Sequence, residues 1–291
     1  MPELPDLAVV TDALYAALAG RSVERAEAPA PLAVRGTPAE LQTMVGQRLK
    51  RVRRRGKFIV FELDRDRIAI NAMLTGRLQL AAPGDKRPQS TAVLLAFGSR
   101  ARGPKDAAAW TARAPWLPPN DASAEVRYRD PSQMGKVYLL PAGVSRPVVG
   151  FEDAEQGPDG DDPALTLEVW RERIRRHPGE LKSLLRNQAF VAGIGNAYSD
   201  EILHAAKLSP FRRRSSLAPE EIDALYGATR ATLANAIGIL KERVPPTFEK
   251  QVRDFLAVHL RGGEACPRCG TRLSEVSSRS EATSWCRGCQ A

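Results

Sequence analysis

The sequence predicts an α+β protein built from more than one domain, and three observations lead to that fold class. Short hydrophobic runs typical of strands fill much of the first half, helical patterns fill most of the second half, and all four cysteines fall in the last 26 residues. The chain has 291 residues, of which 43% are hydrophobic and 26% charged, a globular composition and not a disordered one. This length suits two domains and a small module.

The first half begins with a helix and continues as strands. Residues 6–19 carry apolar side chains at helical spacing, and Gly20 follows them as a stop signal. The runs KFIVFEL and RIAINAML are predicted strands, and the polar residues 64–66 between them predict a turn. The β pattern continues in residues 91–97 and 126–141, and the segment between these predicts a long surface loop.

The second half is predicted to be helical. An acidic, glycine-rich stretch, FEDAEQGPDGDDP, is the expected linker, and LTLEVWRERIRRH, GELKSLLRNQAFV and YSDEILHAAKL are the expected helices after it. In the last of these Ser199 and Asp200 are start signals and Ser209-Pro210 is a stop, and a long amphipathic helix follows from Pro219. The predicted parts are residues 1–150, the linker 151–163, the helical residues 164–261 and a cysteine module at 262–291.

The charge of the chain points to a polyanionic partner. The formal net charge is +9, and basic residues cluster at 51–57 and 212–214, which favours nucleic acid over a surface charge without a specific role. The sequence has no apolar stretch of eighteen residues and no signal peptide, so we expect no membrane span. With cysteines confined to one end, we place the protein in a reducing cytosol.

The four cysteines form two CxxC pairs with metal-ligand spacing. Cys266 and Cys269 are separated from Cys286 and Cys289 by residues 270–285. Two such knuckles can close a tetrahedral, all-thiolate zinc site, which leaves no open coordination position. The sequence therefore predicts one structural zinc ion per chain, and the alternative is a pair of redox dithiols.

A second motif, AFVAGIGNAYSDEIL, places two glycines directly before a predicted helix. The N–H groups of that helix start, together with Asn196, are candidates for a phosphate site, and Lys182 is a candidate second contact. The alternative is that Gly193 and Gly195 only allow close helix packing.

The third motif is the opening, MPELPD. A proline at position 2 permits removal of Met1, which leaves a secondary amine that is partly neutral at pH 7. Attack of such an amine on a carbonyl-like carbon gives an iminium, with Glu3 as a candidate acid/base and Lys57 as a candidate second acid. The alternative is that Pro2 affects only methionine processing and Glu3 caps a helix dipole.

Taken in order, these motifs resemble those of the formamidopyrimidine-DNA glycosylase and endonuclease VIII (Fpg/Nei) family along nearly the whole chain. PELPD resembles the family opening PELPE, RRGKF resembles RRxKY, and VRYRDPSQMG resembles LRYxDPRRFG. GIGNAYSDE matches the helix–two-turn–helix signature GxGNxYxxE, and the last CxxC is followed by Gln290 as in the family. The ordered set is more specific than any one motif.

The resemblance implies a fold and an activity. The fold is an N-terminal helix with a β-sandwich, a helix–two-turn–helix domain and a zinc-ribbon hairpin. The activity is that of a bifunctional DNA glycosylase and AP lyase, which flips a damaged nucleotide out of duplex DNA, attacks it with Pro2 and nicks the strand by β-elimination. We expect a monomer, used on double-stranded DNA with a damaged base or abasic site in the cytoplasm of a bacterium.

The site residues implied by the resemblance fall into two sets. The catalytic set is Pro2, Glu3, Lys57 and Asp6. The DNA-binding set is Asn196, Lys182, Leu74, Gln133, Met134, Tyr198 and Arg279.

The chain departs from the family at several of these positions. Asp6 replaces a glutamate, Leu74 falls where the family has a void-filling methionine, and Ser132-Gln133-Met134 replaces Arg-Arg-Phe. These changes predict a different check of the base opposite the lesion. Glu281 falls where the hairpin normally carries a phosphate-binding arginine, so we expect β-elimination over β,δ-elimination unless Arg279 takes that place.

Two further departures concern the substrate pocket. Residues 241–263 are shorter than the family loop that caps 8-oxoguanine, so we expect a more open pocket and doubt strong activity on that base. Oxidised pyrimidines, formamidopyrimidines and bulkier lesions remain candidates. The insertion at 98–124 carries Trp110 and Trp116, which either touch DNA or pack on the sandwich, and we favour packing because large aromatic side chains usually bury.

Two other functions compete with the enzyme. A lesion-binding protein of the same fold would explain the altered wedge residues and Glu281, while the intact Pro2, Glu3 and Lys57 argue against it. A zinc-ribbon module of transcription or translation would explain the cysteines and the charge, but not the first 190 residues.

Overall fold

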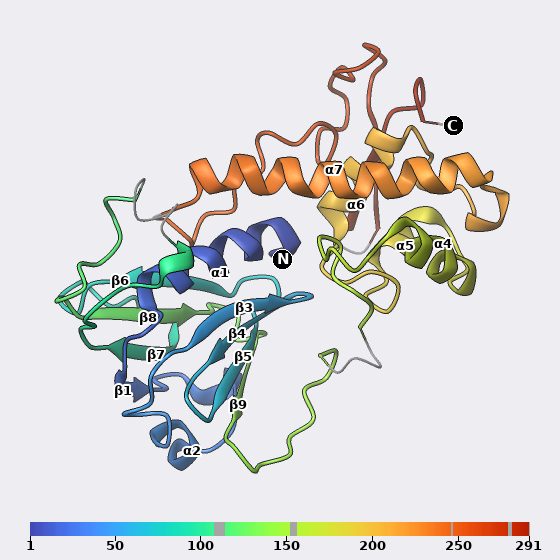
Figure 1. Cartoon of the computed structure of the whole chain (residues 1–291). Helices are drawn as coiled ribbons and strands as arrows, with labels where there is room; N and C mark the ends of the chain where they lie inside the picture. The colour runs from blue at the N-terminus through green and yellow to red at the C-terminus, as the bar shows by residue number, and fades with distance from the viewer. Residues whose placement is uncertain (108–113, 152–155, 246, 279–280, 291) are drawn as a thin grey trace. The chain divides into compact units, whose positions relative to one another are not determined.

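The computed structural model describes residues 1–107, 114–151, 156–245, 247–278 and 281–290 (Figure 1). By its internal contacts the chain divides into two compact units. The N-terminal unit holds residues 1–2, 6–149 and 240–251, and the C-terminal unit holds residues 3–5, 150–239 and 252–291. The cysteine module falls in the same unit as the helices before it, and Trp110 and Arg279 lie outside the described residues.

The predicted first helix is present as α1 (Leu4–Leu18) and begins two residues earlier than its apolar spacing predicts. Pro5 and Asp6 lie in its first turn, where a proline loses no hydrogen bond and an acid complements the helix dipole. Gly20, with φ +86°, follows the helix as expected, because a left-handed residue ends a helix at little cost when it is glycine.

Two sheets form the body of the N-terminal unit (Figure 1). The five-stranded sheet has the order β2-β9-β5-β4-β3, and the four-stranded sheet has the order β1-β7-β8-β6. The bounds are β1 (Val23–Glu27), β2 (Val34–Arg35), β3 (Arg51–Arg55), β4 (Phe58–Glu62), β5 (Arg67–Asn71), β6 (Arg77–Ala81), β7 (Thr91–Phe97), β8 (Ala124–Arg129) and β9 (Lys136–Leu140). Short helical turns add η1 (Pro31–Ala33), α2 (Pro38–Gln42) and η2 (Lys105–Ala107).

The strands predicted from hydrophobic runs are confirmed, and those that the pattern missed are at sheet edges. TAVLLAF is β7, buried at all seven positions between β1 and β8. β1 and β6 are the edge strands of that sheet and carry charged or polar residues, three of five in β1 and two of five in β6, which is how edges avoid further pairing. Their composition hides them from a search for hydrophobic runs.

The insertion at 98–124 is held to α1 by two buried arginines. Arg21 is fully buried and donates to the carbonyls of Ala17 at 2.9 Å, Gly98 at 2.9 Å and Pro119 at 2.7 Å. Arg100 donates to two further carbonyls near the end of α1, at 2.7 and 2.9 Å. Both ends of the loop, around residues 98–100 and 119, are therefore fixed to the unit.

The C-terminal unit is helical, as predicted. Its bounds are α4 (Leu167–Arg176), α5 (Leu181–Arg186), α6 (Asn196–Ala206), η3 (Arg214–Ser216) and α7 (Pro219–Arg243), of which the last four residues belong to the N-terminal unit. One apolar cluster joins these helices around Trp170, Phe190 and Tyr198, and includes Leu4.

Two helix boundaries differ from the prediction. GELKSLLRNQAFV is helical only through Arg186, and α6 starts at Asn196, so the expected start signals Ser199 and Asp200 are buried inside it. The stop also falls earlier, because Lys207 adopts a left-handed conformation with φ +60° before Ser209-Pro210 is reached. The hairpin β10 (Ser274–Ser278) and β11 (Glu281–Trp285) follows, antiparallel and in register.

We predict that Arg21→Ala lowers the free energy of unfolding by about 3 kcal/mol or more, because it leaves several buried carbonyls without a donor. Urea unfolding measures this value. The control is Arg87→Ala, which removes a half-exposed ion pair to Glu27 and is expected to cost no more than about 1 kcal/mol. Equal, small losses in the two variants would contradict the anchoring role of Arg21.

Candidate active site and metal centre

The carboxylate of Glu3 sits on the N-terminus of α6. Its oxygens accept hydrogen bonds from the backbone N–H groups of Gly195 at 2.7 Å, Ala197 at 2.9 Å and Tyr198 at 3.2 Å, and the residue is 4% exposed. Helix N-termini favour an anion at this place. The expected phosphate site on these N–H groups is therefore wrong for this structure, because Glu3 already occupies the donors.

The two glycines before α6 make room for the N-terminal residues. A Cβ at Gly193, whose φ is +94°, would lie 2.8 Å from the side chain of Leu4, and a Cβ at Gly195 would lie 2.5 Å from the carboxyl carbon of Glu3. The backbone N–H of Leu4 also donates to the carbonyl of Gly193 at 2.9 Å. The two glycines therefore allow close packing, as the alternative interpretation of this motif expects. The residues that pack against them are Glu3 and Leu4.

Pro2 lies in a small, mostly apolar pocket of the N-terminal unit. It is buried, and it lines a cavity of about 30 Å³ together with Asp6, Ile59, Phe248 and Gln251. Residues that follow α7 are among those that line this cavity, and the expectation of a more open substrate pocket stays a prediction. Asp6 is 8% exposed in the first turn of α1.

Lys57 is half-buried in the two-residue turn that joins β3 and β4. Ile59, two residues further on, is part of the wall of the Pro2 pocket. Lys57 is therefore close in sequence to a residue that lines the Pro2 pocket. Its catalytic role stays a prediction.

Two neighbouring turns carry the expected wedge residues. Leu74 is 53% exposed in the turn between β5 and β6, and Met134 is 45% exposed in the turn between β8 and β9, next to Gln133 with φ +53°. Asp130 joins these turns and is itself 2% exposed.

The carboxylate of Asp130 accepts hydrogen bonds from both turns. Its donors are the Thr75 hydroxyl at 2.5 Å, the Gly135 N–H at 2.7 Å and the Ser132 hydroxyl at 3.2 Å, with the Tyr128 hydroxyl at 3.3 Å. Burial alone would raise the pKa of Asp130, but these hydrogen bonds hold it below its usual value. Sequence reasoning missed this residue, although Asp-Pro before a turn is a signal for it.

Lys182 and Asn196 meet the hairpin backbone. Lys182 is 6% exposed and donates to the carboxylate of Asp200 at 2.7 Å and to the carbonyl of Ala282 at 2.7 Å, and Asn196 donates to that same carbonyl at 2.9 Å. Burial lowers the pKa of Lys182, and Asp200 opposes that shift. Their phosphate contacts stay predictions that this buried arrangement does not favour.

Tyr198 and Glu281 also have partners within the C-terminal unit. Tyr198 is fully buried, and the guanidinium of Arg253 lies 4.8 Å from its ring centroid. Glu281, at the start of β11, forms an ion pair with Arg186. Tyr198 therefore presents no open surface for DNA, whereas the side chain of Glu281 is 52% exposed, and the roles of both residues stay predictions.

Two adjacent acids of α6 organise the hairpin and were not foreseen. Glu201 accepts hydrogen bonds from the backbone N–H groups of Ala257, Val258 and His259 at 2.7, 2.9 and 2.9 Å. Asp200 lies 2.8 Å from His259 Nδ1 and accepts from the N–H of residue 284 at 3.3 Å. Acids inside an apolar helix are the signal that could have revealed this task, because buried carboxylates need donors.

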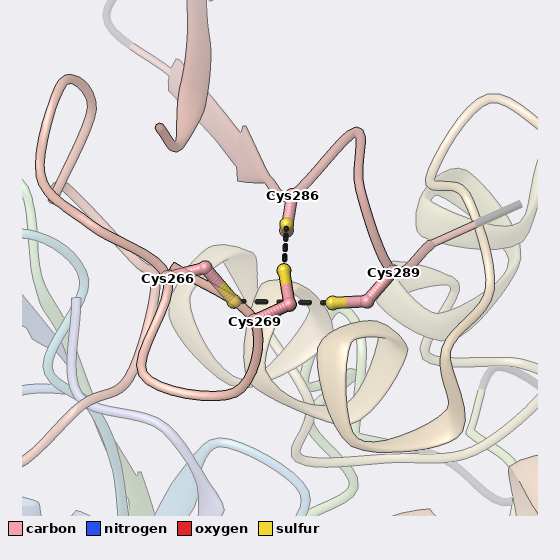
Figure 2. Close-up of side chains that lie close together, drawn as sticks. All are labelled: Cys266, Cys269, Cys286 and Cys289. Atoms are coloured by element: carbon pink, nitrogen blue, oxygen red, sulfur yellow. Dashed lines mark hydrogen bonds between the residues drawn. The ribbon is translucent and has the colours of Figure 1, made fainter. Parts of the chain in front are cut away.

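The four cysteines converge as their spacing predicts (Figure 2). Their sulfur atoms all lie within 4.8 Å of one another, with Cys269 and Cys286 3.4 Å apart and Cys266 and Cys289 3.8 Å apart. Hydrogen bonds from Thr271 lower the pKa of Cys269 to about 6, whereas burial raises the pKa of Cys289 to about 12. Four convergent sulfurs suit one metal ion, which binds the deprotonated forms.

Comparison with known proteins assigns the chain to a family of DNA-repair proteins. The formamidopyrimidine-DNA glycosylase N-terminal domain matches residues 1–137, and the H2TH domain of the same family matches residues 156–245. The chain is 31% identical to the formamidopyrimidine-DNA glycosylase of Symbiobacterium thermophilum over 100% of this chain and 89% of the relative. It is also 31% identical to that of Geobacillus kaustophilus over 100% of both chains.

Solved structures agree on the fold. The Lactococcus lactis Fpg bound to DNA containing an abasic site has a TM-score of 0.80 with 23% identity and covers 99% of both chains. MutM in complex with DNA containing carbocyclic 8-oxo-G has a TM-score of 0.79 with 24% identity over 100% of both chains. The protein belongs to the formamidopyrimidine-DNA glycosylase family, and the predicted fold class is confirmed. Over the described residues, the helices are too short or too polar to cross a membrane.

We predict that Asp130→Asn lowers the free energy of unfolding by about 2 kcal/mol near neutral pH, because an amide presents N–H groups to several donors. The pKa of Asp130 is depressed by folding, so its stabilisation is complete above the unfolded value near 3.9 and is lost as the pH falls through the lower folded value. The difference between wild type and variant should therefore be constant from about pH 6 to 8 and shrink below about pH 4.

Urea unfolding at a series of pH values measures this difference. Asp12→Asn is the control, because Asp12 forms a half-exposed ion pair with Lys241 and should change stability by less than about 1 kcal/mol. A difference for Asp130→Asn that stays the same down to pH 3 would show that its carboxylate is not the group responsible.

Proposed function

We propose that this protein is a bifunctional DNA glycosylase and AP lyase of base excision repair, acting on duplex DNA with oxidised or ring-opened bases. The observation that carries the proposal is the opening of the chain, where a buried proline lines a pocket and the next residue is a carboxylate held by three backbone N–H groups. Family membership supports the same activity, since the relatives are named for it.

Pro2 is the proposed nucleophile. Once Met1 is removed, its secondary amine attacks C1′ of the damaged nucleotide, and the C1′–N bond to the base breaks as the base leaves with a proton. The nitrogen lone pair then forms an iminium to the ring-opened sugar. Loss of a C2′ proton expels the 3′ phosphate, so the strand is cut by β-elimination.

Glu3 and Lys57 are the proposed proton-transfer groups. Opening of the sugar needs a proton at the ring oxygen, and a carboxyl group directly after the nucleophile in the chain is suited to deliver it. Lys57 is proposed to bind phosphate and to act as a second acid, with Asp6 beside the pocket as a supporting group. The hydrogen bonds to Glu3 fix where its carboxylate lies, which is what a proton-transfer group requires.

Contacts with the DNA are proposed at the two turns joined by Asp130. Leu74 and Met134 would enter the base stack at the void left by the flipped nucleotide, as apolar wedges do, with the polar side chain of Gln133 beside them. The net charge of +9 would add attraction to the phosphate backbone that depends on salt and not on sequence.

The metal is proposed to be zinc. Four thiolates satisfy its tetrahedral preference and leave no position for a substrate, so the ion would support the hairpin and take no part in the reaction. Cys266, Cys269, Cys286 and Cys289 would hold it.

We predict that borohydride traps the protein on a duplex with one abasic site, because reduction converts the iminium to a stable amine. Pro2→Gly should weaken the trapped band by about tenfold or more, since a primary amine remains but the secondary amine is lost. The reaction is followed on a denaturing gel, with protein whose free residue 2 has been verified by mass. No band from such protein would refute the lyase and favour a lesion-binding protein of the same fold.

We predict that Cys286→Ser abolishes binding of one zinc ion per chain and lowers thermal stability, because the metal supplies folding energy to a hairpin with little core of its own. Metal analysis and calorimetry of the two proteins measure these effects. Ser277→Ala, on the neighbouring strand, is the control and should keep one ion. Retention of stoichiometric zinc by Cys286→Ser would contradict a four-cysteine site.

A further inference from the structure

The wall of the Pro2 pocket is formed in part by residues 247–251, which follow α7 and are called here the pocket wall. Phe248, Lys250 and Gln251 of this wall line the cavity with Pro2, and Phe248 is 4% exposed. The cavity of about 30 Å³ is far below the ~300–1,000 Å³ typical of ligand pockets. A base that enters this cavity therefore needs some of the lining to move, and residues 247–251 are part of that lining, so whatever holds them influences which bases are admitted.

Two polar contacts connect the pocket wall to the four-stranded sheet. Arg77 donates to the side-chain oxygen of Gln251 at 3.3 Å, and Arg129 forms an ion pair with Glu249 at 3.6 Å. Arg77 and Arg129 are paired residues on β6 and β8. Both contacts are long, and ion pairs near the surface contribute little to stability. The two contacts therefore restrain the position of the pocket wall only weakly.

A third polar contact would not survive processing of the chain. Gln251 donates to the carbonyl of Met1 at 3.0 Å. Removal of Met1, which the proposed chemistry requires, also removes this acceptor. The mature enzyme must therefore hold its pocket wall by other means.

A further contact comes from the insertion at 98–124. The ring of Trp116 meets Phe248 edge to face, with centroids 5.8 Å apart and an interplanar angle of 84°. This is a favourable aromatic geometry between a half-buried tryptophan and a buried phenylalanine. Close to Trp116 in the chain, the carbonyls of Pro118 and Pro119 accept hydrogen bonds from the buried Arg21, so this part of the insertion is held in place.

We propose that Trp116 is a positioning residue for base selection, which sets the pocket wall through Phe248 and so restricts the size of the base that is excised. The inference rests on the proposed function and deepens it. It also gives the insertion a function in the enzyme, because Trp116 of the insertion contacts Phe248 of the pocket wall. Loss of the contact between Trp116 and Phe248 should let bulky ring-opened purines enter the Pro2 pocket more easily, relative to small oxidised pyrimidines.

The test compares two reactions of the same protein. Single-turnover excision is measured on duplexes with a ring-opened purine or an oxidised pyrimidine, and strand cleavage is measured on a preformed abasic site, which needs no base in the pocket. In Trp116→Ala we expect the purine-to-pyrimidine excision ratio to rise by about 2- to 10-fold, the range given by loss of one aromatic contact. Cleavage of the abasic site should stay within twofold of wild type.

Three further variants separate positioning from folding. Trp116→Phe keeps an aromatic edge and should restore the wild-type ratio. Tyr15→Phe removes a hydrogen bond at 2.9 Å to Asp106 in the same insertion without touching the wall, so the ratio should not change. Phe248→Leu removes the same aromatic contact by changing its partner in the pocket wall. It should raise the purine-to-pyrimidine excision ratio even if Trp116→Ala proves unstable.

Two results would overturn the proposal. One is an unchanged excision ratio in both Trp116→Ala and Phe248→Leu. The other is a parallel loss of excision and abasic-site cleavage that follows the loss of thermal stability, which would assign the contact a structural role only. Absence of abasic-site cleavage in the wild type would instead refute the proposed function, and this inference with it.

Discussion

The placing of the Glu3 carboxylate on the N-terminus of α6 is the interaction on which the rest of the proposed site depends. The first residues of a chain usually fray, because few contacts oppose their conformational freedom. Here three backbone N–H groups hold residue 3, a fourth hydrogen bond holds Leu4, and the Leu4 side chain lies in the helical core. A nucleophile at residue 2 is thereby attached to a fixed neighbour, which is the condition for reproducible attack geometry.

The same physical device recurs at the other segments that the activity would use. A buried carboxylate gathers donors from segments that have no regular structure: Asp130 does so for the two wedge turns, and Glu201 for residues 257–259 ahead of the hairpin. Each carboxylate is costly to bury alone and inexpensive once its hydrogen bonds are made, so each holds its loop in one geometry. These few acids therefore fix the geometry of loops that the proposed activity would use.

How far the sequence predicts the fold depends on where the stabilising partner lies. β7 was predicted because six of its seven residues are apolar and the strand is buried between two others, whereas the edge strands β1 and β6 gave no hydrophobic run. The start of α6 was misplaced because its capping group is Glu3, 192 residues earlier, and not the local Ser199 or Asp200. Local patterns cannot reveal a cap supplied from so far along the chain.

The candidate site shows the same contrast between features set by local sequence and features set by partners far away in the chain. The cysteine cluster was predicted because ligand spacing alone defines it, and the structure brings the four sulfurs together. The small Pro2 cavity was not predicted, because Phe248, which helps to line it, contacts Trp116, a residue that lies 132 positions earlier in the chain. That Trp116 would meet Phe248 is a property of the tertiary fold and of no sequence motif.

The central claim is that the amine of Pro2 forms the covalent intermediate, and the most direct measurement locates the adduct. The borohydride-reduced complex is digested with nuclease and trypsin, and the modified peptide is identified by mass spectrometry. The account predicts a sugar remnant on the peptide that begins at Pro2 and ends at Arg21, with its mass increase on the proline nitrogen. A remnant on the side chain of Lys57, with an unmodified Pro2 peptide, would contradict it.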